Sequence, residues 1–263
     1  MIKLLTPISH HFENIESVEN IIDISDELEA RERTCHLNLK NTTHYHIDFD
    51  LNIGLSNDQI EFLIKHVKPR ENIHTLTFQA ARDCEEVKLL NKKYHPVSRP
   101  IGLNEQILNT KKSIKIIKDI VGSDRNIGIE NNNYYPTGAY DICTSESYLI
   151  EVCQVNNIHL LFDYAHAMVT SFNRNFKFKD YSDSLLSNLD CTQVHICEPT
   201  FTYNEKGEVL AEDSHNLPKP NTTQNLLELT NKFQIKYITV EFYKDAVNLL
   251  NYMKYLKKSL NNG

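Results

Sequence analysis

One stretch decides the fold: NIGIENNNYYPTGAYDICTSESYLIEVCQVNNIHLLFD, residues 126–163. It contains two short apolar runs, 126–130 and 158–163, and between them lies the amphipathic pattern of residues 145–154. Apolar runs without polar alternation are typical of strands that are buried on both faces. The order strand, helix, strand therefore predicts a parallel βα unit at this point of the chain.

The same alternation continues on both sides of this stretch. We expect further strands at 45–53, 73–78, 192–197 and 236–241, with weaker candidates at 3–8 and 33–39. We expect helices over 56–67, where Ser56 and Gln59 form a capping-box pattern, and over about 243–260, with Val247, Leu250 and Leu256 on its apolar stripe.

Six to eight such units in 263 residues favour a (β/α)8 TIM barrel of the α/β class. We expect residues 1–263 to form a single TIM-barrel domain with an irregular N-terminal part. No GxGxxG or GxxxxGK[ST] loop follows a predicted strand, which disfavours a dinucleotide-binding or P-loop fold.

Composition narrows the class of protein. The chain is 40% hydrophobic and 24% charged, which is enough apolar material for a core, and its net charge of -7 argues against nonspecific nucleic-acid binding. Its six cysteines show no CxxC spacing and are expected to be reduced thiols. It lacks a signal-peptide pattern and any run of about 18 apolar residues. We therefore expect a cytoplasmic protein that does not bind membranes.

Carboxylates and imidazoles gather at the ends of the predicted strands and in the motif EDSH (212–215). They are His46, Glu130, Asp163, His166, His195, Asp213, His215 and Glu241. Divalent metals take such oxygen and nitrogen ligands, and an unpaired buried carboxylate costs several kcal/mol. Each residue alone is more often a helix cap, an ion-pair partner or a core histidine. Their repetition at successive strand ends is what predicts a metal site, and the other eight histidines are assigned to surface or packing.

Five motifs carry a resemblance to a known family. They are ENNNYYPTGA (130–139), LLFDYAH (160–166), VHICEP (194–199), EDSHNLP (212–218) and TVEF (239–242). Together they resemble the multinuclear non-haem iron-dependent oxidase family, which includes the oxidase of methanobactin biosynthesis. The likeness covers roughly residues 44–255 and is strongest after residue 126. More distantly, the same ligand order resembles endonuclease IV and other xylose-isomerase-like barrels.

The resemblance implies a role for each matching residue. Glu130 would bridge two metals, and one site would be completed by Asp163, His195 and Glu241. A second site would use His166, Asp213 and His215, and His46 would hold a remaining ion with Glu130. We also expect substrate contacts from Asn131, Tyr134 and Tyr164.

The chain departs from the family pattern at two positions. Gln79 stands where the relatives place a histidine, and because an amide is a weaker ligand than imidazole, the site at His46 is expected to bind loosely or stay empty. Asp163 is followed three residues later by His166, as in endonuclease IV, where the family pattern reads D-x-N-N. That change could tighten the site that contains His166.

The resemblance implies two or three iron ions, with zinc or manganese as the other metals to consider. One iron would bind the thiolate of a cysteine-containing peptide or a related thiol, and its neighbour would activate dioxygen. A separate precursor-recognition protein would deliver the peptide, and no nucleic acid is expected as a partner. Three alternatives stay open: a divalent-metal phosphodiesterase like endonuclease IV, a sugar isomerase-like barrel, and a barrel that binds without catalysing.

Overall fold

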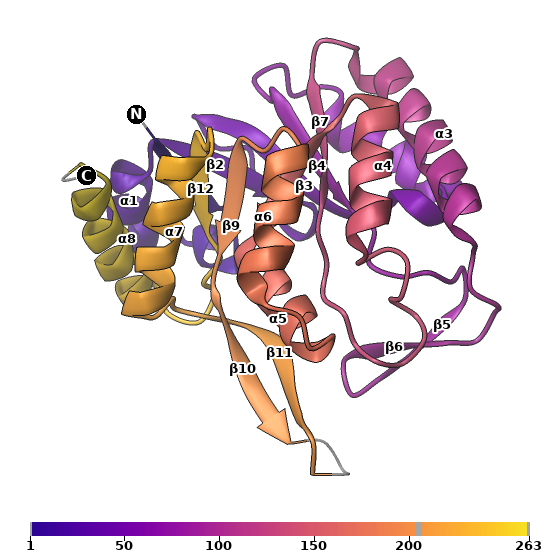
Figure 1. Cartoon of the computed structure of the whole chain (residues 1–263). Coiled ribbons are helices and arrows are strands. Elements are labelled where there is room, and N and C mark those ends of the chain that lie inside the picture. Colours follow the sequence, from indigo (N-terminus) through magenta and orange to yellow (C-terminus); the bar gives the residue numbers. More distant parts are fainter. Residues whose placement is uncertain (1, 204–206, 262–263) are drawn as a thin grey trace.

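A computed structural model describes residues 2–203 and 207–261. Within them, eight parallel strands close into a barrel in the order β1-β12-β9-β8-β7-β4-β3-β2 (Figure 1). The strands are β1 (Lys3–Pro7), β2 (Glu27–Arg31), β3 (Thr42–Asp50), β4 (Thr75–Gln79), β7 (Asn126–Glu130), β8 (His159–Asp163), β9 (Gln193–Ile196) and β12 (Tyr237–Val240). The predicted TIM-barrel fold is confirmed.

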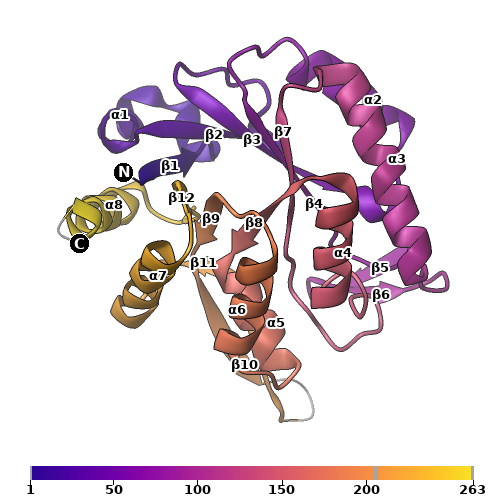
Figure 2. The same ribbon diagram turned by 45° about the horizontal axis from the view of Figure 1, so that its top comes forward.

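Helices form an outer ring around these strands (Figure 2). They are α1 (Ile15–Ile24), α2 (Asn57–Phe62) continued by a π-helical turn (Leu63–Val67), α3 (Leu103–Val121), α4 (Glu146–Asn156), α5 (Tyr164–Asn173), α6 (Phe178–Asn188), α7 (Pro220–Lys232) and α8 (Ala246–Asn261). Short 3-10 turns lie at His10–Glu13, Glu32–Thr34 and Leu51–Ile53. Among the described helices, none combines the length and the apolar character that crossing a bilayer requires.

The helix predictions hold where a cap and an apolar stripe agree. The capping box of Ser56 and Gln59 begins α2. In α4, the predicted stripe is buried against the strands. In α8, Leu256 is buried and Leu250 packs against the core as predicted, whereas Val247 is 67% exposed. A helix on the outside of a barrel buries only the face that contacts the rest of the protein, and Val247 lies outside that face.

The N-terminal part differs from the prediction. It is regular, since β1, α1 and β2 complete the barrel, and the strand expected at 33–39 is wrong: residues Glu32–Thr34 form a 3-10 turn there. The true strand, β2, reads ELEAR over residues 27–31. This strand has no continuous apolar run, because charged residues alternate with apolar ones along it. Two of the charged side chains, Glu29 and Arg31, form an ion pair of 2.7 Å.

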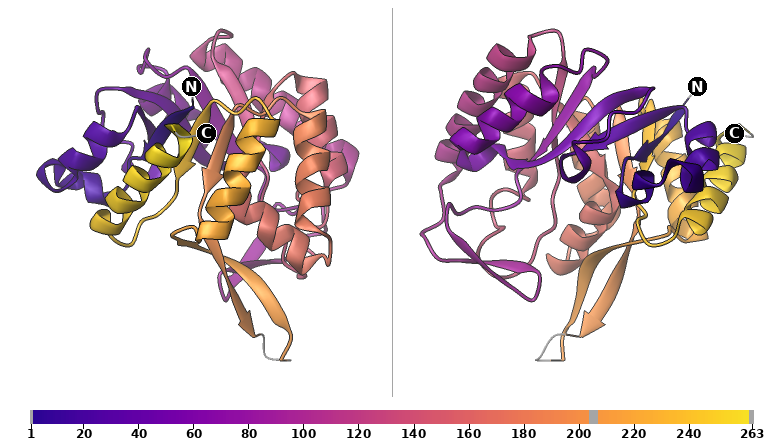
Figure 3. Two further views of the ribbon diagram at one scale, coloured as in Figure 1. Left: turned by 60° about the vertical axis from the view of Figure 1, so that its left-hand side comes forward. Right: turned by 180° about the vertical axis from the view of Figure 1, so that it is seen from behind.

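Two antiparallel hairpins extend beyond the carboxyl ends of the barrel strands. One joins β5 (Val87–Leu90) to β6 (Lys93–Pro96), and the other joins β10 (Glu198–Tyr203) to β11 (Val209–Asn216). The second hairpin projects away from the barrel in both views of Figure 3. Asp213 and His215 lie on its second strand, β11.

Candidate metal centre

A cavity of about 910 Å³ opens at the carboxyl ends of the barrel strands. This is the end of the barrel where the loops after parallel strands meet and where such folds build their sites. Six of the eight predicted ligands line it: His46, Glu130, His166, Asp213, His215 and Glu241. The other two, Asp163 and His195, are fully buried beneath it.

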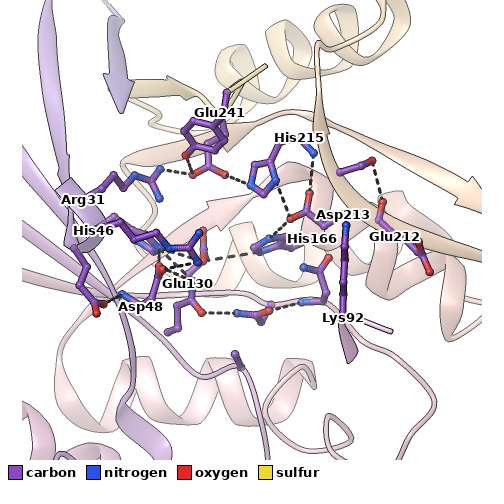
Figure 4. A pocket seen from close by; sticks show the side chains of 18 of the residues that line it. Arg31, His46, Asp48, Lys92, Glu130, His166, Glu212, Asp213, His215 and Glu241 are labelled. Atoms are coloured by element: carbon purple, nitrogen blue, oxygen red, sulfur yellow. Dashed lines mark hydrogen bonds and ion pairs between the residues drawn. The ribbon is translucent and has the colours of Figure 1, made fainter. Parts of the chain in front are cut away.

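Glu130, the last residue of β7, lies at the centre of the cluster (Figure 4). Its Oε1 is 3.2 Å from Nδ1 of His195, and its Oε2 is 3.6 Å from Nε2 of His46 and 3.9 Å from Nδ1 of His166. Burial opposes ionisation of Glu130, but the imidazoles of His46 and His166 lower its pKa overall. Its Oε2 has no hydrogen-bond partner. A buried carboxylate is thus surrounded by three imidazoles.

His195 is held in one orientation by its ring nitrogens. Nε2 donates to Oε2 of Glu29 at 2.9 Å, so Nδ1 is the ring nitrogen left to bind a metal ion. This Nδ1 lies 3.2 Å from Oε1 of Glu130 and 3.2 Å from Oε1 of Glu241, and it has no hydrogen-bond partner. A second carboxylate behind a metal-binding histidine is a common way to fix the tautomer.

The ligands next to α5 are arranged by the cap of that helix. Oδ1 of Asp163 accepts a hydrogen bond of 2.7 Å from the backbone N–H of His166, which leaves Oδ2 without a partner. Burial and the nearby carboxylate of Glu130 raise the pKa of Asp163 to about 7. Nδ1 of His166 donates to the Asn131 carbonyl, so its Nε2 faces Oδ2 of Asp163 at 3.9 Å and Oδ2 of Asp213 at 3.6 Å.

The β10–β11 hairpin carries two of the predicted ligands, Asp213 and His215. In Figure 4, Asp213 lies between His166 and His215. His215 adopts a positive φ of 44°, with Nδ1 3.5 Å from Oδ2 of Asp213 and Nε2 3.6 Å from Oε2 of Glu241. The thiol of Cys197, which sequence reasoning left aside, lies 3.7 Å from Oδ1 of Asp213.

The predicted ligand set fits a divalent cation. Most of these nitrogen–oxygen distances exceed those of hydrogen bonds, whereas two ligands of one ion with bonds of about 2.1 Å lie about 3–3.5 Å apart. Among the residues that the structure describes, three groups have their donor atoms within 4.8 Å of one another: Glu130 with Asp163 and His166, Glu29 with His195 and Glu241, and Cys197 with Asp213 and His215. The unpartnered atoms of Glu130, Asp163 and His195 are the donors that such ions would need.

Two functional residues were missed because β2 was missed. Glu29 is completely buried, and its Oε1 pairs with the guanidinium of Arg31 at 2.7 Å. Arg31 also pairs with Oε1 of Glu241. The one available signal was the alternation of charged and apolar residues in ELEAR (27–31), which is typical of a barrel strand with polar side chains pointing inward.

The structure does not bring the three predicted substrate-binding residues into the cavity. Tyr164 is buried against Phe178 with ring centroids 4.7 Å apart. The ring of Tyr134 packs against the guanidinium of Arg174, whose Cζ lies 4.1 Å from the ring centroid. Asn131 is fully buried and bonds to the backbone of Asp163. Among the described residues, the cavity is lined instead by their neighbours Asn132, Asn133 and Tyr135.

Comparisons with known proteins agree with this fold. Residues 94–257 match the model of a family described as RiPP precursor modification enzyme MbnB/TglH/ChrH. No curated protein matches the chain.

Solved structures with the same fold are xylose-isomerase-like TIM barrels. The 3-keto-D-glucoside 4-epimerase YcjR of E. coli is similar with a TM-score of 0.64 and 13% identity, over 98% of this chain and 100% of its own. D-psicose 3-epimerase of Clostridium cellulolyticum is similar with a TM-score of 0.60 and 10% identity, over 99% of each chain. Endonuclease IV of Thermus thermophilus is similar with a TM-score of 0.60 and 9% identity, over 98% of this chain and 99% of its own.

Proposed function

Because this chain belongs to the RiPP precursor modification enzyme family MbnB/TglH/ChrH, we propose that it is a multinuclear iron-dependent oxidase. Its substrate is a cysteine-containing peptide or a related thiol, and residues 1–263 act as one barrel domain in the cytoplasm. A separate precursor-recognition protein delivers the peptide. Zinc and manganese are the other metals that the same donors would accept.

The observation that carries this proposal is the position of Glu130 among three imidazoles, at 3.2 Å from His195, 3.6 Å from His46 and 3.9 Å from His166. The imidazoles come from β9, β3 and α5, so they approach the carboxylate from different sides. A carboxylate in this position suits a ligand shared between two ions. When bound, iron ions supply a centre that binds thiolate and activates dioxygen.

The protein's own residues prepare this site. Glu29 holds the lone pair of His195 toward the centre, and Asn131 does the same for His166 through its carbonyl oxygen. Arg31 balances part of the acidic charge by pairing with Glu29 and Glu241. Because these groups are fixed before a substrate arrives, little reorganisation is needed when it binds.

The cavity, with a volume of about 910 Å³, is the space that would receive a segment of the peptide. Its wall includes β11, which carries Asp213 and His215, and the tip of the β5–β6 hairpin with Lys92 and Lys93. Nζ of Lys93 pairs with Oε1 of Glu212 at 2.5 Å, which ties the two hairpins together across the opening. We propose that the cysteine of the substrate enters between these hairpins.

Anaerobic purification followed by metal analysis tests the proposal, together with oxygen consumption in the presence of cysteine-containing peptides. The expected result is two or three iron ions per chain and thiol-dependent oxygen uptake. Glu130→Ala and His195→Ala should lose both. Protein that holds only zinc, and that is inert toward thiols and oxygen after iron is supplied, would contradict the assignment.

The fold is shared with sugar epimerases and with endonuclease IV, so the same preparation should be assayed with ketoses and with abasic DNA. Metal-dependent turnover of either would replace the oxidase assignment with an isomerase or a phosphodiesterase. Unchanged metal content and fold in both Glu130→Ala and His195→Ala would favour a barrel that binds without catalysing.

A further inference from the structure

A second set of donors lies on the side of Glu130 away from the hairpin ligands, where Figure 4 shows His46 and Asp48 together. His46 is 1% exposed, and its Nε2 lies 3.5 Å from Oδ1 of Asp48 and 3.6 Å from Oε2 of Glu130. Oε2 of Glu130 is buried and has no hydrogen-bond partner. An unpartnered carboxylate oxygen, a second carboxylate and an imidazole therefore surround one point at the cavity wall.

A chain of hydrogen bonds fixes the orientation of Gln79 beside this point. The backbone N–H of Asn133 donates to Oδ1 of Asn132 at 2.8 Å, so the side chain of Asn132 has its amide nitrogen left to donate. That nitrogen donates to Oε1 of Gln79 at 3.4 Å. The amide nitrogen of Gln79 consequently faces Nε2 of His46 at 3.4 Å and Oδ1 of Asp48 at 3.3 Å.

This orientation has two consequences. Gln79 turns its oxygen away from His46, so it does not offer a ligand atom there. Nε2 of His46 accepts from an amide and therefore carries the lone pair, while Nδ1 donates to Oγ1 of Thr77 at 2.9 Å. The available oxygen at this point is Oδ1 of Asp48, because Oδ2 is the atom that faces Arg33 at 3.6 Å.

We propose that Asp48 is a metal ligand that completes a third cation site with His46 and Glu130, and that Gln79 orients Asp48 without binding the ion. This inference rests on the proposed metal centre. A site with one imidazole and two carboxylates offers harder donor atoms, in the hard–soft sense, than a site with two imidazoles. It therefore suits hard divalent cations such as manganese and iron(II). Asp48 is 37% exposed at the cavity wall, so this ion is also the one that exchanges most easily.

Manganese titration of the metal-free full chain tests the proposal, with free Mn²⁺ followed by its electron paramagnetic resonance signal. Wild-type protein is expected to bind three ions, the third most weakly. Asp48→Asn should weaken that third ion by at least about tenfold and leave the first two unchanged. Gln79→His should tighten it, because an imidazole then replaces an amide.

Glu212→Gln is the matched control, since it removes the same charge from the cavity wall at the Lys93 pair and away from His46. Its titration should follow the wild type. Thermal unfolding of each variant checks that the barrel is intact.

The results that would overturn the Asp48 assignment, the third site and the proposed function can be told apart. A curve for Asp48→Asn that superimposes on the wild type overturns the assignment of Asp48. Wild-type protein that binds only two ions overturns the third site and leaves the proposed function standing, whereas binding of none refutes both.

Discussion

Oε2 of Glu29 accepts a hydrogen bond of 2.9 Å from Nε2 of His195, although 166 residues separate them. Both side chains have no exposed surface. The contact crosses the barrel interior from β2 to β9, and it turns Nδ1 of His195 toward Glu130 and Glu241. The strand β2, which lies outside the residues 94–257 matched by the family model, thereby orients a side chain of the proposed centre.

Glu29→Gln should weaken metal binding at His195 by about 10–100-fold, because a carboxylate behind the imidazole raises its basicity and fixes its tautomer. It should also destabilise the fold by several kcal/mol, since Arg31 loses a buried partner. Metal titration and urea unfolding measure the two effects. Glu27→Gln, on the same strand but in a pair with the exposed Lys3, is the control and should change neither by much. Equal behaviour of the two variants would show that Glu29 is an ordinary ion-pair residue.

Asp213→Ala should lose one metal equivalent and most of the activity while the barrel still folds. The reason is that Asp213 lies on β11, in a hairpin outside the barrel, whereas Glu130 ends a barrel strand. Metal stoichiometry and circular dichroism check this, with Glu130→Ala as the comparison that should disturb more of the cluster. A stoichiometry identical to that of the wild type would contradict the role of Asp213.

The sequence predicted the barrel, and the structure places the eight proposed ligands at one end of it, because the ends of parallel strands in βα units meet there. It missed Glu29 and Arg31, since inward-facing charges in ELEAR (27–31) hide a strand from any search for apolar runs. The substrate contacts predicted for Asn131, Tyr134 and Tyr164 stay a prediction, although none of the three side chains lines the cavity. The sequence does not show whether a tyrosine next to a proposed ligand points into the core or into the cavity. The direction of the backbone at that residue decides this.

Gly128→Ala should destabilise the protein by about 1–3 kcal/mol or more, because the added methyl group meets the imidazole of His159. A Cβ at position 128 would lie 2.4 Å from Nε2 of His159, a buried residue of the neighbouring strand β8 that is paired with Gly128 in the sheet. Urea unfolding measures the change. Gly102→Ala is the control, since a Cβ there meets nothing within 4 Å, and it should stay within about 0.5 kcal/mol. Similar losses at both glycines would mean that chain flexibility, and not the clash, sets the cost.

The imidazole of His159 also makes the stability of the protein depend on pH. Burial lowers the pKa of His159 to about 4, below the usual 6.5. The unfolded chain therefore binds a proton at higher pH than the folded chain, so the stability due to neutral His159 is complete above pH 6.5 and is lost as pH falls toward 4. Between pH 7.5 and 5.5 the loss is about 1 kcal/mol.

Unfolding of metal-free protein at both pH values, for the wild type and for His159→Gln, isolates this effect. Histidines with raised pKa, such as His166 and His195, gain stability as pH falls, but they contribute equally to both proteins. The wild type should therefore lose about 1 kcal/mol more than His159→Gln over this interval. Parallel pH profiles would show that His159 is protonated in the folded state as readily as in the unfolded chain.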